Sequence, residues 1–86
     1  MVHEVTTEEL RRGWGRTVIH AIAERDPVAA GIYKHARPEL VDDWLLVCHF
    51  DNDFTLKLAN ERPRRKAVEV TLYELIGREF SVGVSR

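Results

Sequence analysis

The sequence predicts a small α+β domain in which helices pack against a three-stranded sheet. Apolar residues recur at three- and four-residue spacing before residue 36 and between residues 62 and 76, as they do in amphipathic helices. The run Trp44–Phe50 carries no formal charge and is rich in aromatic and branched side chains, which is typical of a strand. Phe80, Val82 and Val84 alternate with small residues near the C-terminus, as on a strand with one buried face.

Length and composition fit one domain. The chain has 86 residues, of which 44 % are hydrophobic, and we predict a lead-in over residues 1–6 followed by a single domain over residues 7–86. A single cysteine, no signal-peptide pattern and no apolar run of about 18 residues together indicate a cytoplasmic protein without a membrane partner. The formal net charge of -1 argues against a surface that holds nucleic acid by charge alone.

The first helix is expected to begin at Thr6. Thr6 and Glu9 have the spacing of a capping box, in which Thr6 caps the helix and Glu9 reaches back to its amide. Trp14 lies on a stripe of apolar residues at four-residue spacing, which places it on the buried side of the helix. Gly13 and Gly15 flank Trp14, and each costs roughly 1 kcal/mol of helix propensity relative to alanine. We interpret both glycines as tolerated in the helix rather than as sites of close backbone approach.

A second helix and a hairpin follow. Asp26-Pro27 supplies a cap and a proline in the first turn, so we expect a helix that runs to about Ala36. Glu39 to Val41 is the first predicted strand, Asp42-Asp43 the turn, and Trp44–Phe50 the central strand. Apolar residues of both parities in the central strand indicate that both of its faces are at least partly covered. A buried helix is the alternative for so short a run, and the flanking aspartates favour the strand.

Two more helices and a strand complete the prediction. Asp51 or Asp53 caps a short helix that ends near residue 60, and a long helix runs from Arg62 to Ile76. Gly77 stops the long helix in the left-handed conformation. The last strand follows a helical crossover and can therefore lie parallel to a strand of the hairpin. The buried face of the long helix is expected to carry Val68, Leu72, Leu75 and Ile76.

After the first helix, the predicted order of elements is that of a type II K-homology fold. Further residues match one family: Glu8-Glu9-Leu10, Trp14, Ala36-Arg37-Pro38, Phe50, Phe54, Leu58, and Leu75-Ile76-Gly77-Arg78 before the last strand. Over nearly its whole length the sequence resembles the carboxy-terminal K-homology-like domain of the gamma/tau (clamp-loader) subunit of bacterial DNA polymerase III. The amino-terminal domain of the bacterial replication initiator has a similar pattern and is the rival family.

The clamp-loader resemblance implies a module that holds other replisome proteins, such as the polymerase or the helicase. The chain has no phosphate-binding loop and no recognisable nucleophile motif, so we expect no catalysis, no cofactor and no small-molecule substrate. Large aromatic residues are enriched at interfaces, and an acidic turn would suit a partner of opposite charge. The candidate interface residues are Trp44, Tyr33, Asp42 and Asp43.

Nucleic-acid binding is the alternative function. K-homology domains that bind nucleic acid clamp its backbone with a Gly-x-x-Gly loop between the two central helices. The corresponding stretch, Ala59–Pro63, contains no glycine. Glu61–Lys66 nevertheless carries a net charge of +3, four cations less one carboxylate, at a helix N-terminus that favours an anion. The candidate contacts to phosphate or an acidic partner are Arg62, Arg64, Arg65 and Lys66, and a solvated helix start is the alternative interpretation.

No metal site is predicted. His20, His35, Cys48 and His49 lie on three different predicted elements and lack the short ligand pairs of structural zinc sites. Cys48 lies inside the apolar central strand, so we expect a buried and inert thiol. His49 either faces solvent or makes a hydrogen bond in the core.

Overall fold

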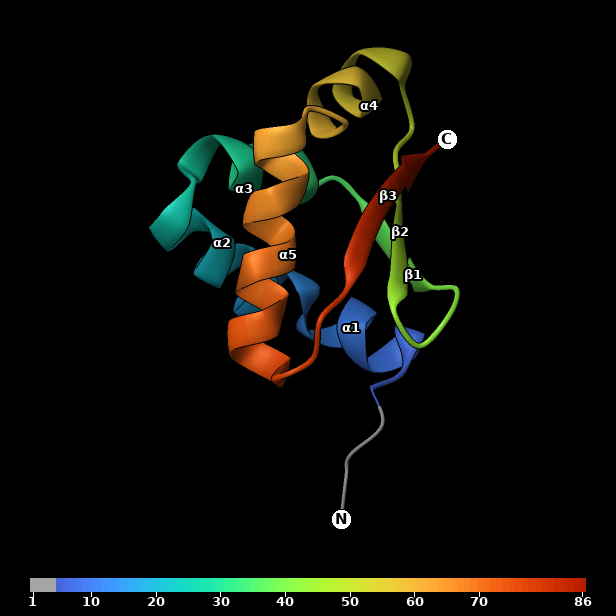
Figure 1. The fold of residues 1–86 in the computed structure, drawn as a ribbon. Helices are drawn as coiled ribbons and strands as arrows, with labels where there is room; N and C mark the ends of the chain where they lie inside the picture. Colours follow the sequence, from blue (N-terminus) through green and yellow to red (C-terminus); the bar gives the residue numbers. More distant parts are fainter. Residues whose placement is uncertain (1–4) are drawn as a thin grey trace.

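The computed structural model describes residues 5–86 (Figure 1). The predicted α+β class and the order helix, helix, strand, strand, helix, helix, strand are confirmed, with the first helix interrupted by a π-helical segment. The predicted lead-in covers residues 1–6, and its first four residues lie outside the described part of the chain. The elements are α1 (Thr7–Gly13), η1 (Trp14–Ile19), α2 (His20–Arg25), α3 (Pro27–Tyr33), β1 (Arg37–Leu40), β2 (Leu45–His49), α4 (Asp53–Ala59), α5 (Arg62–Ile76) and β3 (Ser81–Ser85).

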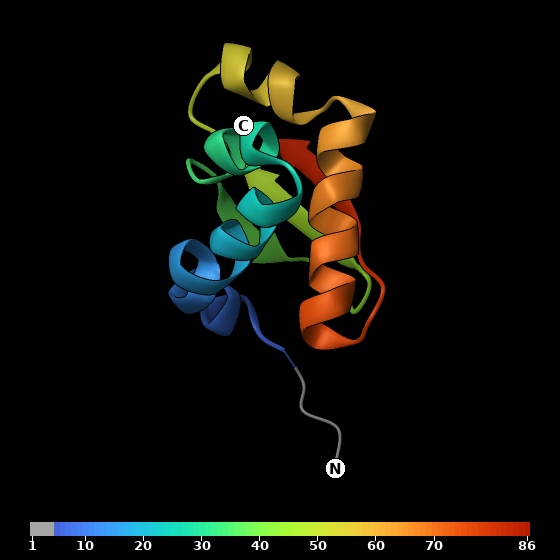
Figure 2. The ribbon, with the colours of Figure 1, turned by 90° about the vertical axis from the view of Figure 1, so that its left-hand side faces the viewer.

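The sheet has the strand order β1-β2-β3, with β1 antiparallel and β3 parallel to β2. Leu46 is the central residue, because it pairs with Leu40 on one side and Val82 on the other. Figure 2 shows α2, α3 and α5 in front of the sheet and α1 beside β1. Leu46 and Cys48 face these helices and are completely buried, whereas Leu45 and Val47 are half-buried. The prediction that both faces of this strand are at least partly covered is therefore confirmed, and the cover is complete on the face towards the helices.

The first helix differs from the prediction through η1. Trp14 and Val18 in η1 are buried, as the apolar stripe predicts, but the backbone widens to a π-helix there. A Cβ added at Gly15 would meet no described atom within 4 Å, and one added at Gly13 would lie 3.8 Å from the Thr17 hydroxyl. Neither distance is a close approach, so the interpretation of both glycines as tolerated is confirmed.

Two side-chain hydrogen bonds in the core connect η1, α3 and α4. The indole Nε1–H of Trp14 donates to the carbonyl of Tyr33 at 2.9 Å, and the Tyr33 hydroxyl donates to the carbonyl of Ala59 at 2.7 Å. The Tyr33 ring also meets Phe50 edge to face, with 5.6 Å between ring centroids. Tyr33 has no exposed surface, so its prediction as an interface residue is wrong. Burial raises the pKa of its hydroxyl well above the ordinary value.

The second helix ends at Tyr33, three residues before the predicted end at Ala36. The Tyr33 carbonyl accepts the Ala36 N–H at 3.0 Å as well as the Trp14 indole, so the chain leaves the helix in a tight turn. Arg37 precedes a proline and is therefore held in an extended conformation. As a result β1 starts at Arg37, earlier than the predicted strand that begins at Glu39.

Helix caps agree with the prediction at two ends and differ at a third. Thr6 Oγ1 accepts the Glu9 N–H at 3.2 Å, and Asp26 caps α3 through Oδ1. Helix α4 is capped by Asn52, whose Oδ1 accepts the Thr55 N–H at 2.8 Å. The predicted caps are occupied elsewhere: Asp51 pairs with Arg37 at 2.6 Å and Asp53 with Arg86 at 2.7 Å.

Helix α5 has the predicted bounds, and its buried face is shifted from the predicted one. Val68 and Leu72 are completely buried, whereas Leu75 is 43 % exposed at the end of the helix. Two smaller residues, Ala67 and Thr71, complete the buried face. The Thr71 hydroxyl donates to the Ala67 carbonyl at 2.8 Å, which satisfies its polar atom inside the core.

Replacing Gly77 with alanine is expected to lower the free energy of unfolding by about 1 kcal/mol. Gly77 follows α5 with φ of +82°, where a side chain is strained although no described atom lies within 4 Å of an added Cβ. Gly31→Ala is the matched control because Gly31 lies inside α3 with equally open surroundings. This control is expected to raise the free energy by about 0.5–1 kcal/mol. Urea unfolding measures both changes, and shifts of the same sign would contradict the prediction.

Candidate functional site

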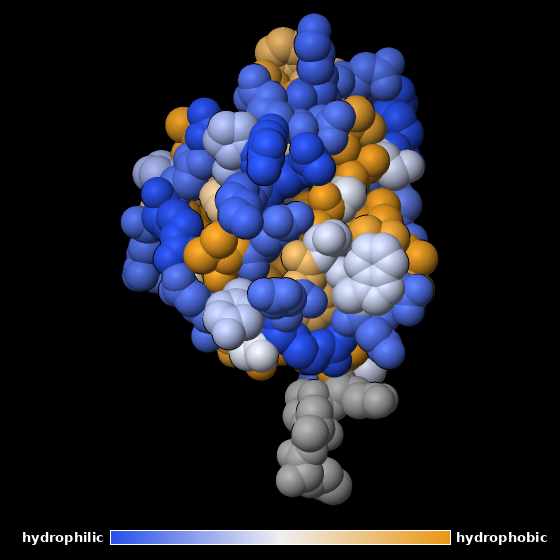
Figure 3. Space-filling model, in the orientation of Figure 1, coloured by the Kyte–Doolittle hydropathy of each residue, from blue (hydrophilic) through white to orange (hydrophobic). Residues whose placement is uncertain are grey.

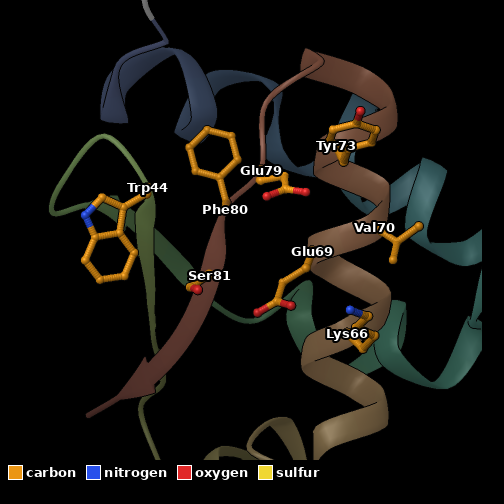
Figure 4. Close-up of a pocket in the computed structure, with 8 residues that line it drawn as sticks. All are labelled: Trp44, Lys66, Glu69, Val70, Tyr73, Glu79, Phe80 and Ser81. Atoms are coloured by element: carbon orange, nitrogen blue, oxygen red, sulfur yellow. The ribbon is translucent and has the colours of Figure 1, made fainter.

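A groove of about 600 Å³ lies between α5 and the start of β3 (Figure 4). Two large aromatic side chains on its border are exposed, Trp44 by 55 % and Tyr73 by 52 %. They come from different elements, since Trp44 precedes β2 and Tyr73 belongs to α5. In Figure 3, hydrophobic surface appears among polar atoms on the side of the molecule that α5 and β3 share. The lining residues are Trp44, Lys66, Glu69, Val70, Tyr73, Glu79, Phe80 and Ser81.

Glu69 crosses the groove from α5 to β3. Its Oε2 accepts the backbone N–H of Val82 at 2.9 Å, and Figure 4 shows the side chain pointing from the helix to the strand. Lys66 and Glu79, which also line the groove, are exposed. The groove thus combines apolar walls with charged side chains that solvent can reach.

Arg78 fixes the turn that carries Trp44. Its guanidinium lies 5.0 Å from the centroid of the Phe80 ring and donates a hydrogen bond to the carbonyl of Asp43. These two contacts connect the turn before β2 with the segment that enters β3. Trp44, Asp42 and Asp43 are all exposed at this turn, so three of the four predicted interface residues lie at or beside the groove.

The four cations at the start of α5 do not form one free patch. Arg64 donates through Nη1 to Asp26 Oδ2 at 2.6 Å, and only 29 % of its side chain is exposed. Arg65 donates to the carbonyl of Asn60 at 3.1 Å. Arg62 is exposed, whereas Lys66 faces the groove. The four predicted contacts are therefore divided between two side chains that are engaged within the fold, Arg64 and Arg65, and two accessible cations, Arg62 and Lys66.

Apart from Lys66, the α5 side of the groove was not predicted from the sequence. Glu69, Val70 and Tyr73 lie off the buried stripe that carries Val68 and Leu72, so periodicity assigns them no contact. A signal was present, since a tyrosine on the polar side of an amphipathic helix has no core to enter. The contact of Glu69 with β3 had no signal, because it depends on how the chain turns after Gly77 and pairs β3 with β2.

Two of the four candidate metal ligands, Cys48 and His49, are buried or engaged in contacts within the fold. Burial raises the pKa of the Cys48 thiol to about 12, which makes it a poor nucleophile at neutral pH. His49 is half-buried at the sheet surface, with Nε2 2.7 Å from Glu39 Oε1 and Nδ1 3.3 Å from the Arg86 carbonyl. In the part of the chain that the structure describes, no three His, Cys, Asp or Glu side chains are placed to hold a metal ion. None of the helices described is long and apolar enough to cross a membrane.

Comparison of the chain with protein-family models, curated proteins and solved structures gives no match. Its family stays a proposal. What the chain offers for a functional argument is the groove beside β3 together with the residue pattern that resembles a clamp-loader domain.

Proposed function

We propose that this chain is a non-catalytic protein-interaction module of the bacterial DNA replication machinery. The groove between α5 and β3, with exposed Trp44 and Tyr73 on its border, is the observation that carries the proposal. Exposed aromatic residues beside a depression are typical anchors of protein interfaces, because each buries a large area at small cost in side-chain entropy. The module binds a partner protein through this groove.

The class of partner comes from the sequence resemblance. The pattern around Trp14, Phe50 and Gly77 is similar to the clamp-loader gamma/tau domain, so the proposed partners are replisome proteins such as a polymerase or helicase subunit. Nucleic-acid binding is less well supported, because the link between α4 and α5 is only Asn60-Glu61 and contains no glycine. In addition, Arg64 is occupied by Asp26.

Trp44→Ala is expected to weaken binding of the partner subunit more than tenfold, because it removes the exposed anchor of the groove. Purified polymerase and helicase subunits are titrated against the immobilised chain, and the dissociation constants are compared. Phe54→Ala is the matched control, since Phe54 is 73 % exposed but borders a different depression on α4. This control is expected to change affinity less than twofold.

Single-stranded DNA and RNA are titrated in the same experiment at two salt concentrations. Salt-dependent nucleic-acid binding that disappears in Arg62→Ala/Lys66→Ala, with no binding of replisome subunits, would replace the proposal by the nucleic-acid alternative. Equal affinity of the wild type and Trp44→Ala for a bound subunit would contradict the groove as the binding surface.

A further inference from the structure

The two outer edges of the sheet differ in how far other elements of the fold cover them. At the β1 edge, the Leu40 N–H donates to Thr7 Oγ1 at 2.9 Å and the Pro38 carbonyl accepts Arg11 Nε at 3.0 Å. Both partners belong to α1, which lies along this edge (Figure 2). The β1 edge is therefore covered, and two of its outward main-chain groups, the Leu40 N–H and the Pro38 carbonyl, are already paired.

The β3 edge keeps main-chain groups for another strand. The Ser81 N–H donates to the Trp44 carbonyl at 2.7 Å and the Ser85 carbonyl accepts the Phe50 N–H at 2.8 Å, so these residues face β2. Alternation along a parallel strand then directs the main-chain groups of Val82 and Val84 outward. Of these groups, the Val82 N–H is taken by Glu69. The other three find no hydrogen-bond partner within residues 5–86.

Glu69 occupies the position that the carbonyl of an added strand would take. Paired strands lie about 4.8 Å apart, so an extended segment alongside β3 would run in the groove between that strand and α5. Its side chains would alternate between the helix wall, which carries Val70 and Tyr73, and the side of the strand where Trp44 lies (Figure 4). The edge, the groove and the two exposed aromatics thus fit a single extended occupant.

The charged residues around the groove indicate which amino acids the extended occupant would carry. A peptide carbonyl that takes the Val82 N–H releases the half-buried Glu69 carboxylate, which is costly to leave unpaired. Glu79 lies nearby on the groove and the Asp42-Asp43 turn is adjacent, whereas Lys66 is the one cation among the lining residues described. A segment that alternates apolar with basic residues would fill the walls and neutralise Glu69.

We infer that an extended segment of a partner protein, alternating apolar and basic residues, adds to the sheet at the β3 edge and displaces Glu69 from Val82. This inference rests on the proposed function and deepens it, because it names the part of the partner that binds. Strand addition to an exposed sheet edge derives its affinity from main-chain hydrogen bonds and its specificity from alternate side chains.

The test selects ten-residue random peptides on the immobilised full chain and then measures the winners in solution. The expected winners alternate apolar with Lys or Arg residues, and Glu69→Gln is expected to weaken them at least tenfold. Neutral alternating peptides leave the displaced Glu69 carboxylate unpaired in the wild type, so they are expected to bind Glu69→Gln at least as tightly as the wild type, which controls for folding. Winners that are acidic or lack alternation would overturn the inference.

Main-chain pairing is tested separately. Val84→Pro removes an outward N–H at a position where an edge strand accepts proline, and it is expected to weaken the selected peptides at least tenfold. Val84→Thr, which keeps the N–H, is expected to bind within twofold of the wild type. A second measurement uses the wild type and does not require the proline variant to fold. The selected peptide is expected to slow amide hydrogen exchange at Val84 at least tenfold, and unchanged exchange would overturn the inference.

The two proposals fail in different ways. If a replisome subunit binds and Trp44→Ala weakens it, but Val84→Pro leaves its affinity unchanged and Val84 exchange is unaffected, the inference fails and the proposed function stands. If the selected basic peptides bind and slow Val84 exchange while no replisome subunit binds, the strand-addition site stands and the assignment to the replication machinery fails.

Discussion

Replacing Trp14 with alanine is expected to lower the free energy of unfolding by about 3–5 kcal/mol. The Trp14 side chain is 5 % exposed and packs in the core, so truncation removes a large buried area and leaves a cavity. It also removes the indole donor to the Tyr33 carbonyl. A domain of this size is stable by roughly 4–13 kcal/mol, at about 0.05–0.15 kcal/mol per residue, so the variant is expected to be close to unfolding at 37 °C. Urea denaturation followed by circular dichroism measures the change.

Two further variants separate the contributions at Trp14. Trp14→Phe keeps most of the apolar contact and loses the N–H donor, so its expected cost is smaller, about 1–3 kcal/mol. Trp44→Ala is the matched surface control, and because Trp44 is 55 % exposed its expected cost is within about 0.5 kcal/mol. A cost for Trp14→Ala as small as the cost expected for Trp44→Ala would contradict the assignment of Trp14 to the core.

Replacing Asp26 with alanine is expected to lower the free energy of unfolding by about 2–4 kcal/mol. Asp26 Oδ1 accepts the N–H groups of Val28 and Ala29 at 3.1 Å each, and its Oδ2 accepts Arg64 Nη1 at 2.6 Å. The loss of a helix cap costs about 1 kcal/mol. The loss of the ion pair adds about 1–3 kcal/mol, because only 17 % of the Asp26 side chain is exposed and Arg64 is left without this partner. Asp26→Asn keeps a capping oxygen and is expected to show mainly the ion-pair loss.

The contribution of Asp26 to the free energy of unfolding is expected to depend on pH. Burial opposes ionisation of Asp26, but the Ala29 N–H and the hydrogen bond and charge of Arg64 outweigh it and lower the pKa below its ordinary value. A carboxyl whose pKa is lower in the folded state stabilises the protein above the unfolded pKa of about 3.9, and this stabilisation is lost as the pH falls through the folded pKa.

The measurement compares the wild type with Asp26→Asn in urea at several pH values between 7 and 2.5. The difference in unfolding free energy between the two proteins is expected to be constant above about pH 5 and to shrink towards acid pH. The pKa of Asp51 is also lowered, by its hydrogen bond to Arg37, but Asp51 is present in both proteins. A difference that stays constant down to pH 2.5 would show that the Asp26 carboxylate gains nothing from the Arg64 pair.

The parts of the fold that local signals determine were predictable from the sequence. Pro63 in the first turn and Gly77 after the last gave both ends of α5, and Asp26-Pro27 gave the start of α3. The cap of α4 was not predictable in the same way. Asp51 and Asp53 have suitable side chains, but ion pairs with Arg37 and Arg86, 14 and 33 residues away, take both carboxylates.

The candidate site was predictable only in part. Trp44 was found because an aromatic residue at a strand end beside an acidic turn stands out in the sequence. Tyr33 was misjudged since its position on α3 does not reveal that its hydroxyl reaches the Ala59 carbonyl on α4. Glu69 could not be found at all, because its role depends on the pairing of β3 with β2, which places β3 beside α5. Contacts that depend on the pairing of strands and helices in space therefore could not be predicted from periodicity and composition in this chain.

The completely buried Cys48 makes the chain a convenient subject for site-specific labelling. Maleimide dyes react with thiolates, and a thiol enclosed in the central strand with a pKa of about 12 stays unmodified while the protein is folded. A cysteine introduced at the exposed position Phe54 would take up one dye without removal of the native cysteine. In denaturant the native thiol would become reactive in turn, so its rate of modification would report how often the sheet opens.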